Sequence, residues 1–82
     1  MKNNQTIIGE EFLDQYNVGD IVRYCGDTFQ DCIELRVGII LDIINLSLWN
    51  EIYPHAKVYV MGHDKEELVM LGNLTILYKV SD

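Results

Sequence analysis

Five short runs of β-prone residues, each ended by turn residues, place the strongest constraint on the fold of this 82-residue chain. Valine, isoleucine and aromatic residues dominate the runs, whereas glycine, asparagine and aspartate dominate the segments between them. The runs cover residues 21–24, 36–45, 56–61, 67–71 and 75–80. So few short strands leave adhesive edges unless the sheet curls on itself. The sequence therefore predicts an all-β fold, a small five-stranded barrel.

Helical structure is expected only as one or two short turns. Apolar residues within 10–16 recur at three- to four-residue spacing, which suits a single turn, and 72–74 breaks the chain before the last run. Residues 1–8 are mostly polar and carry no cap or turn signal. We therefore expect a flexible N-terminal arm over 1–8 and one barrel domain over 9–82.

Alternation within the longest run predicts which of its residues face the core. A period of two is typical of a strand with one buried face. The residues predicted to point inward are Val37, Ile39, Leu41 and Ile43. Gly38 between them would allow a bend. Residues 62–65, Gly-His-Asp-Lys, predict a tight hairpin between the third and fourth runs.

The positions of glycine and valine in these runs resemble those of a known group of barrels. The segments that carry the resemblance are 18–24 (VGDIVRY), 37–43 (VGIILDI), 56–60 (AKVYV) and 74–77 (LTIL). They look like small SH3-like barrel proteins encoded by tailed bacteriophages and, more remotely, like the KOW-type barrel. The resemblance covers about residues 17–80 and implies an SH3-like barrel of phage origin.

The net charge of the chain limits the classes of partner that it is expected to bind. Thirteen acidic and six basic residues give a formal net charge of −7, which opposes attraction to nucleic-acid phosphates and to anionic lipid. KOW-type barrels that bind nucleic acid are generally basic, so this chain departs from them. The acidic surface serves solubility, docks a basic partner or mimics DNA, and these alternatives stay open.

The cellular compartment is predicted from the absence of long apolar segments in the sequence. No run of about 18 apolar residues is present, and the first residues lack the apolar stretch of a secretory signal. We therefore expect no membrane association and a location in the cytoplasm, that of the host cell for a phage protein. Cys25 and Cys32 are then expected to be reduced thiols.

Motifs for catalysis, metal binding and nucleotide binding are not found in the sequence. Cys25 and Cys32 are seven residues apart, and His55 and His63 eight, whereas structural zinc takes ligand pairs at closer spacing. The glycines are scattered and form no phosphate-binding loop. The sequence therefore predicts a non-enzymatic protein with no cofactor and no metal.

The most unusual segment is 46–53, LSLWNEIY, which is apolar where a loop between strands should be polar. Its apolar residues repeat at helical spacing, so one interpretation is an amphipathic turn that closes the barrel. The other is an anchor patch for another protein or a second copy, since Trp and Tyr dominate interface hot spots. The candidate partner-binding residues are Phe29, Leu48, Trp49, Ile52, Tyr53 and Tyr59.

These observations favour a non-enzymatic protein–protein interaction module, a phage accessory protein that binds a host or virion protein. Direct nucleic-acid binding is disfavoured by the charge, and self-association is allowed. The alternative is a nucleic-acid-related function, either an acidic DNA mimic that inhibits a host nuclease or direct binding in the KOW manner.

Overall fold

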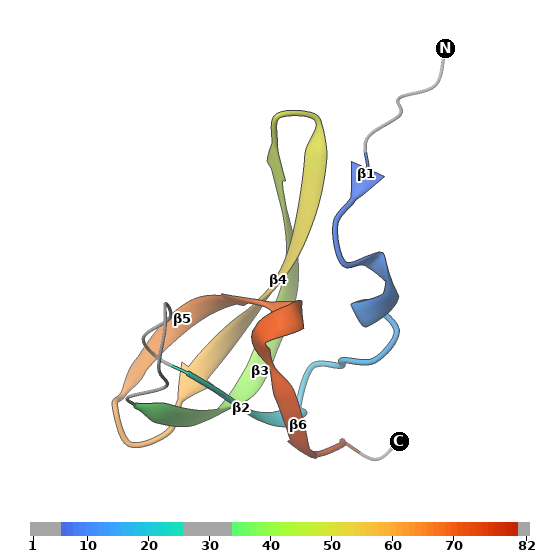
Figure 1. Ribbon diagram of the computed structural model, residues 1–82. Coiled ribbons are helices and arrows are strands. Elements are labelled where there is room, and N and C mark those ends of the chain that lie inside the picture. The colour runs from blue at the N-terminus through green and yellow to red at the C-terminus, as the bar shows by residue number, and fades with distance from the viewer. Residues whose placement is uncertain (1–5, 26–33, 81–82) are drawn as a thin grey trace.

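The computed structural model describes residues 6–25 and 34–80. These residues form six strands and two short 3-10 turns (Figure 1). The elements are β1 (Thr6–Ile7), η1 (Glu10–Phe12), β2 (Ile21–Cys25), β3 (Leu35–Leu48), β4 (Glu51–Val60), β5 (Lys65–Met70), η2 (Leu71–Asn73) and β6 (Thr75–Tyr78). The prediction of an all-β fold with at most two short helical turns is confirmed for these residues.

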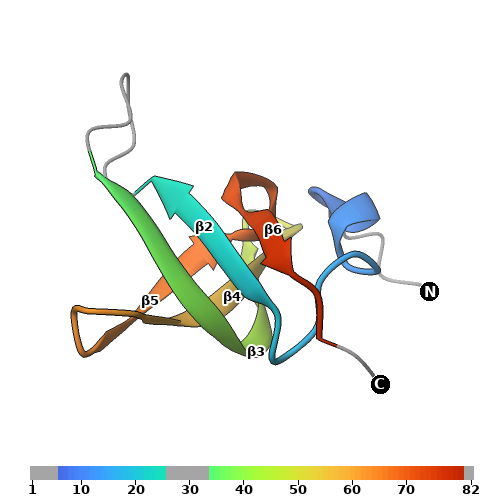
Figure 2. The same ribbon diagram turned by 90° about the horizontal axis from the view of Figure 1, so that it is seen from below.

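The strands form one mixed sheet that curls into a half-barrel. The order is β1-β4-β3-β2-β6, and β5 pairs with β4 beside this path. β2 lies between β3 and β6, and η2 carries the chain from β5 to β6 (Figure 2). All pairs are antiparallel except β1 with β4. The five predicted strands are therefore present in order, and β1 is an additional sixth.

The hydrophobic core fills the inside of the curl. β4 supplies its centre, because alternate residues of this strand are buried and include Val58 and Val60. η1 closes one end, where Tyr16 just beyond it donates a hydrogen bond of 2.7 Å to the carbonyl oxygen of Leu74. The buried core residues are Tyr16, Val22, Tyr24, Ile40, Ala56, Val58, Val60, Val69, Leu71 and Leu74.

The predicted inner face of β3 is wrong for Val37, Ile39 and Leu41 and right for Ile43, and a β-bulge lies between the two parts. Gly38 and Ile40 are buried, so the odd-numbered residues from 37 to 41, which were predicted to point inward, do not form the inner face. The register with β4 then shifts between Ile40 and Asp42. One extra residue in a strand reverses the face of every residue after it, and Ile43 therefore packs against the core.

The segment 45–55, predicted to be a loop, is instead the outer part of a long β-hairpin. β3 and β4 stay paired out to Leu48 and Glu51. Trp49 and Asn50 make the turn with φ angles of 51° and 64°. Two positive φ angles are what a two-residue type I′ hairpin turn requires. The predicted amphipathic helical turn is therefore wrong, because apolar residues at strand alternation were interpreted with a helical period.

The N-terminal strand β1 adds to this hairpin. Thr6 and Ile7 pair in parallel with Glu51 and Ile52, and the Ile8 amide donates to the Ile52 carbonyl oxygen at 2.7 Å. The part of the predicted flexible arm that the structure describes, residues 6–8, thus belongs to the sheet. Phe12 of η1, which follows β1 in the chain, packs against the core. This packing places β1 beside β4, where the two can pair in parallel.

Candidate functional site

The outer hairpin, residues 44–55, extends away from the barrel and is called the arm below (Figure 1). β1 flanks it along β4. On the other side, β2 pairs with β3 only from Leu35 to Ile39. Within residues 6–25 and 34–80, no strand pairs with the arm on that side. The arm is therefore a narrow ribbon in which residues 45–50 are exposed to solvent.

The arm has two chemically distinct faces. Residues opposite each other in an antiparallel pair lie on the same face. Leu46 pairs with Tyr53, and Leu48 with Glu51, so these four side chains share one face. Ile52 lies on the opposite face. Because the arm projects beyond the core, the leucines of the first face are 40% and 51% exposed.

The tip of the arm is apolar and ordered by its turn. Trp49 is 83% exposed, and Leu48 beside it is 51% exposed. A tryptophan at a positive φ angle is uncommon, because the backbone crowds a bulky side chain there. The tip therefore presents the largest side chain of the chain to solvent in a strained position. Exposed aromatic groups on a rigid turn are typical of interface hot spots.

The arm is almost free of charge although the chain is strongly acidic. Glu51 is the one Asp, Glu, Lys or Arg residue among residues 44–55. Its carboxylate accepts a hydrogen bond from the Tyr53 hydroxyl, which raises the pKa of Tyr53. The arm thus presents apolar and uncharged polar residues, and its single carboxylate is already hydrogen-bonded.

The structure brings together most, but not all, of the predicted partner-binding residues. Leu48, Trp49, Ile52 and Tyr53 all lie on the arm, with Ile52 on the face opposite to the leucines. Tyr59 lies eight residues beyond Glu51 on β4, about 26 Å along an extended strand. Its hydroxyl donates to Asp64 at 3.3 Å. Phe29 lies outside the described residues.

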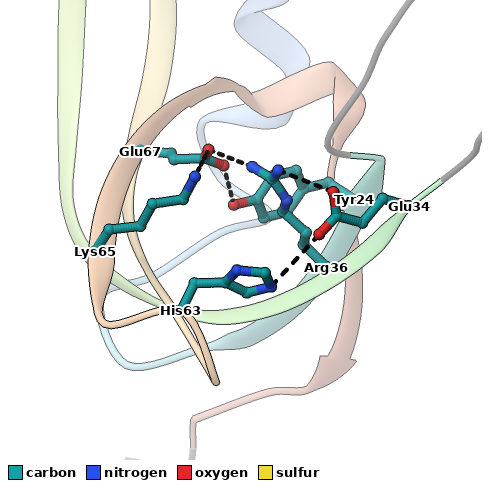
Figure 3. A network of polar contacts seen from close by, with 6 residues as sticks. All are labelled: Tyr24, Glu34, Arg36, His63, Lys65 and Glu67. Carbon is teal, nitrogen blue, oxygen red and sulfur yellow. Dashed lines mark hydrogen bonds and ion pairs between the residues drawn. The ribbon is translucent and has the colours of Figure 1, made fainter.

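Figure 3 shows a polar network formed by the side chains of Tyr24, Glu34, Arg36, His63, Lys65 and Glu67. Glu67 on β5 is at its centre. One carboxylate oxygen accepts from the Tyr24 hydroxyl at 2.6 Å, and the other accepts from Arg36 and from Lys65, the latter at 3.2 Å. Burial alone would raise the pKa of Glu67, but these three donors outweigh it and lower the pKa to about 2. The network thus joins β2, β3 and β5.

The same network reaches the turn after β4. Arg36 also donates to Glu34 at 3.0 Å, and Glu34 lies 3.5 Å from His63 Nε2 in that turn. Burial, and then the Glu67 carboxylate, raise the pKa of Tyr24. Hydrogen bonds from Arg36 are the main cause of a lowered pKa at Glu34. These contacts hold the open ends of three strands together.

Lowering the pH is expected to destabilise the fold through Glu67. Its folded-state pKa of about 2 lies below the ordinary value of 4.5, so the unfolded chain takes up a proton first as pH falls. The stabilisation is therefore complete above about pH 5 and is lost towards about pH 2, a change on the order of 2 kcal/mol. Urea unfolding at several pH values would measure it. Glu67→Gln should be less stable at neutral pH and show a flatter dependence in this window, whereas an unchanged slope would contradict the assignment.

A hollow of about 390 Å³ adjoins this network, lined among others by Tyr24, Cys25, His55 and Glu67. Glu67 is bound by three donors, so it serves as a structural anchor rather than as a free general base. Cys25 is disulfide-bonded, and the expectation of a reduced thiol is wrong at this position. The residues that the structure describes contain no group of three or more His, Cys, Asp or Glu side chains placed to hold a metal ion.

Two features of the site were not predicted from the sequence. The side chains of Tyr24 and Glu67 meet across 43 residues. No local pattern marks such a pair, because it depends on how the strands fold back on one another. Leu46 was also missed. The alternation of Leu46 with Leu48 was a strand signal that could have identified both leucines as one face of a hairpin.

No known protein family, curated protein or solved structure matches this chain. The SH3-like and phage resemblance therefore stays a prediction. Over residues 6–25 and 34–80, no helix has the length and apolarity needed to cross a membrane.

Proposed function

We propose that this chain is a non-enzymatic protein-interaction module that docks its partner through the tip of the arm. The observation that carries the proposal is the exposure of Trp49 and Leu48 at the end of an ordered hairpin. A partner that covers this tip removes from water about 150–250 Å² of tryptophan surface. A host or virion protein is the kind of partner that the phage resemblance favours.

Replacing Trp49 by asparagine is expected to abolish docking while keeping the hairpin. Asparagine accepts a positive φ angle and is a preferred residue in type I′ turns, so the turn should be relieved rather than broken. The free energy of unfolding of Trp49→Asn should therefore be about 0.5–1 kcal/mol higher than that of the natural chain. Partner affinity should fall at least about 30-fold, as for a hot-spot residue.

The measurement is affinity capture from host lysate with the tagged chain, with and without nuclease, followed by a binding titration with the captured protein. Tyr78→Thr is the matched control, because Tyr78 is also a highly exposed aromatic residue but lies on β6, away from the arm. Equal loss of binding in both variants would contradict docking through the tip. Capture that disappears with nuclease would instead support the nucleic-acid-related alternative.

A further inference from the structure

An apolar hollow lies at the base of the arm, between η1, β4 and η2. Its volume is about 110 Å³. Apolar side chains and two glycines line it, and no charged residue is among them: the side chains are Ile8, Phe12, Pro54, Met70 and Leu71. The hollow opens to solvent beside the same β4 strand that leads to the tip. A site of this composition suits an apolar or aromatic side chain, because it offers no partner for a charged group.

The tip of the arm presents an apolar side chain but cannot reach this hollow within one molecule. Pro54 lines the hollow and pairs with Asn45, and Trp49 lies four residues beyond Asn45 on the same hairpin, about 13 Å along the strand. The pairing between β3 and β4 keeps the two apart. Two copies whose arms lie side by side in opposite directions would bring each tip to the base of the other. Such an arrangement is a closed twofold dimer with two identical contacts.

The distribution of charge favours a second copy over a basic partner at this surface. Each chain carries a net charge of −7, so two copies repel each other over most of their surfaces. The arm itself adds little to this repulsion, because Glu51 is its one carboxylate. A basic protein would find no cluster of carboxylates at the tip to steer it.

We propose that the chain forms a twofold homodimer in which Trp49 of each copy fills the apolar hollow beside Pro54 and Met70 of the other. The inference rests on the proposed function in one respect, that the tip of the arm is a docking element. Two inserted indoles and the walls that receive them make a small interface, so the dimer is of the weak, concentration-dependent kind.

Fluorescence of Trp49 tests the contact directly, because Trp49 is the only tryptophan of the chain. Its emission should move to shorter wavelength as protein concentration rises, in parallel with the dimer fraction from analytical ultracentrifugation. Trp49→Asn should raise the dissociation constant at least about tenfold. A chain that stays monomeric with unchanged emission at the highest attainable concentration would overturn the inference.

Variants of the hollow separate insertion from simple contact between arms. Met70→Lys places an ammonium group in the hollow and should also weaken the dimer at least about tenfold, although it lowers the net charge from −7 to −6 and so reduces repulsion. Leu68→Lys is the matched control, because Leu68 is two residues away on β5 and outside this hollow. Equal dissociation constants for Met70→Lys and the natural chain would overturn the insertion.

Mixing the two defective variants gives the sharpest result. Trp49→Asn keeps the hollow and contains no tryptophan, whereas Met70→Lys keeps the tip. Adding the first to the second should restore one of the two contacts and shift the emission of the Met70→Lys tryptophan to shorter wavelength. No shift on mixing would overturn the inference. Loss of a captured partner in Trp49→Asn, with no self-association of the natural chain, would leave the proposed function standing and the dimer refuted.

Discussion

Replacing Gly38 by alanine is expected to prevent stable folding. A Cβ atom at this position would lie within 3.0 Å of both the Val58 side chain and the Tyr59 carbonyl oxygen. The second contact is with backbone, which cannot rotate away. Overpacking of this kind costs about 3 kcal/mol or more when the core cannot shift, a large part of the stability of a domain of this size. Urea unfolding monitored by circular dichroism would measure the loss.

Gly62→Ala is the matched control for this substitution. Its Cβ would meet no atom within 4 Å, but Gly62 has a φ angle of 84°. The expected cost is therefore only about 1 kcal/mol, from backbone strain alone. If Gly38→Ala were as mild as Gly62→Ala, then β3 and β4 would not approach as closely at Gly38 as the structure shows.

Replacing Asp20 by alanine is expected to destabilise the chain by about 2–4 kcal/mol, since it removes a buried acceptor and leaves backbone amides without their hydrogen-bond partner. Asp20 is fully buried. Its carboxylate accepts from the Val80 amide at 2.8 Å and from the Asn17 amide and Lys79 Nζ, both at 2.9 Å. Without it, the two backbone amides lose their acceptor, whereas the Lys79 ammonium keeps the Gln15 carbonyl oxygen and Asn17 Oδ1. The segment after β6 would then be held to the turn before β2 through the Lys79 hydrogen bonds, without the one from the Val80 amide.

Two further variants separate the charge of Asp20 from its hydrogen bonds. Asp20→Asn keeps one acceptor oxygen and should lose less stability than Asp20→Ala, while Lys79→Met should lose less than either because Lys79 is partly exposed. Burial raises the pKa of Asp20, but the hydrogen bonds from Val80, Asn17 and Lys79 outweigh it and the pKa is lowered. The stabilisation is thus present at neutral pH and declines in acid. Equal unfolding free energies for the natural chain and Asp20→Ala would contradict this role.

Local patterns in the sequence were sufficient for the strands whose residues alternate between core and solvent. β2, β5 and the inner half of β4 follow the runs at 21–24, 67–71 and 56–61. The hairpin predicted at 62–65 is present, with Gly62 and Asp64 at positive φ angles. Each of these features depends on residues that are neighbours in the chain, so a period of two and a turn signal are enough to define it.

The sequence identified the apolar segment of the arm but not its hairpin, because the turn has unusual residues. Type I′ hairpins are recognised by Asn-Gly or Asp-Gly, whereas this one has Trp49 and Asn50. Without that signal, the apolar segment was interpreted as a loop with a helical turn. The sequence did identify the segment as one that needs a covering surface. Its exposure was decided by β3 and β4, which stay paired well beyond the edge of the core.

The sequence by itself determined an acidic, all-β chain with five strands in a given order and an apolar segment at 46–53 that is out of place in a loop. Tertiary structure decided which face of β3 is buried, that Trp49 stands in solvent, and that Glu67 meets Tyr24 and Arg36. Alternation and turn signals are properties of adjacent residues. A bulge such as that before Asp42, or a contact across 43 residues, depends instead on which strand register buries the most apolar surface.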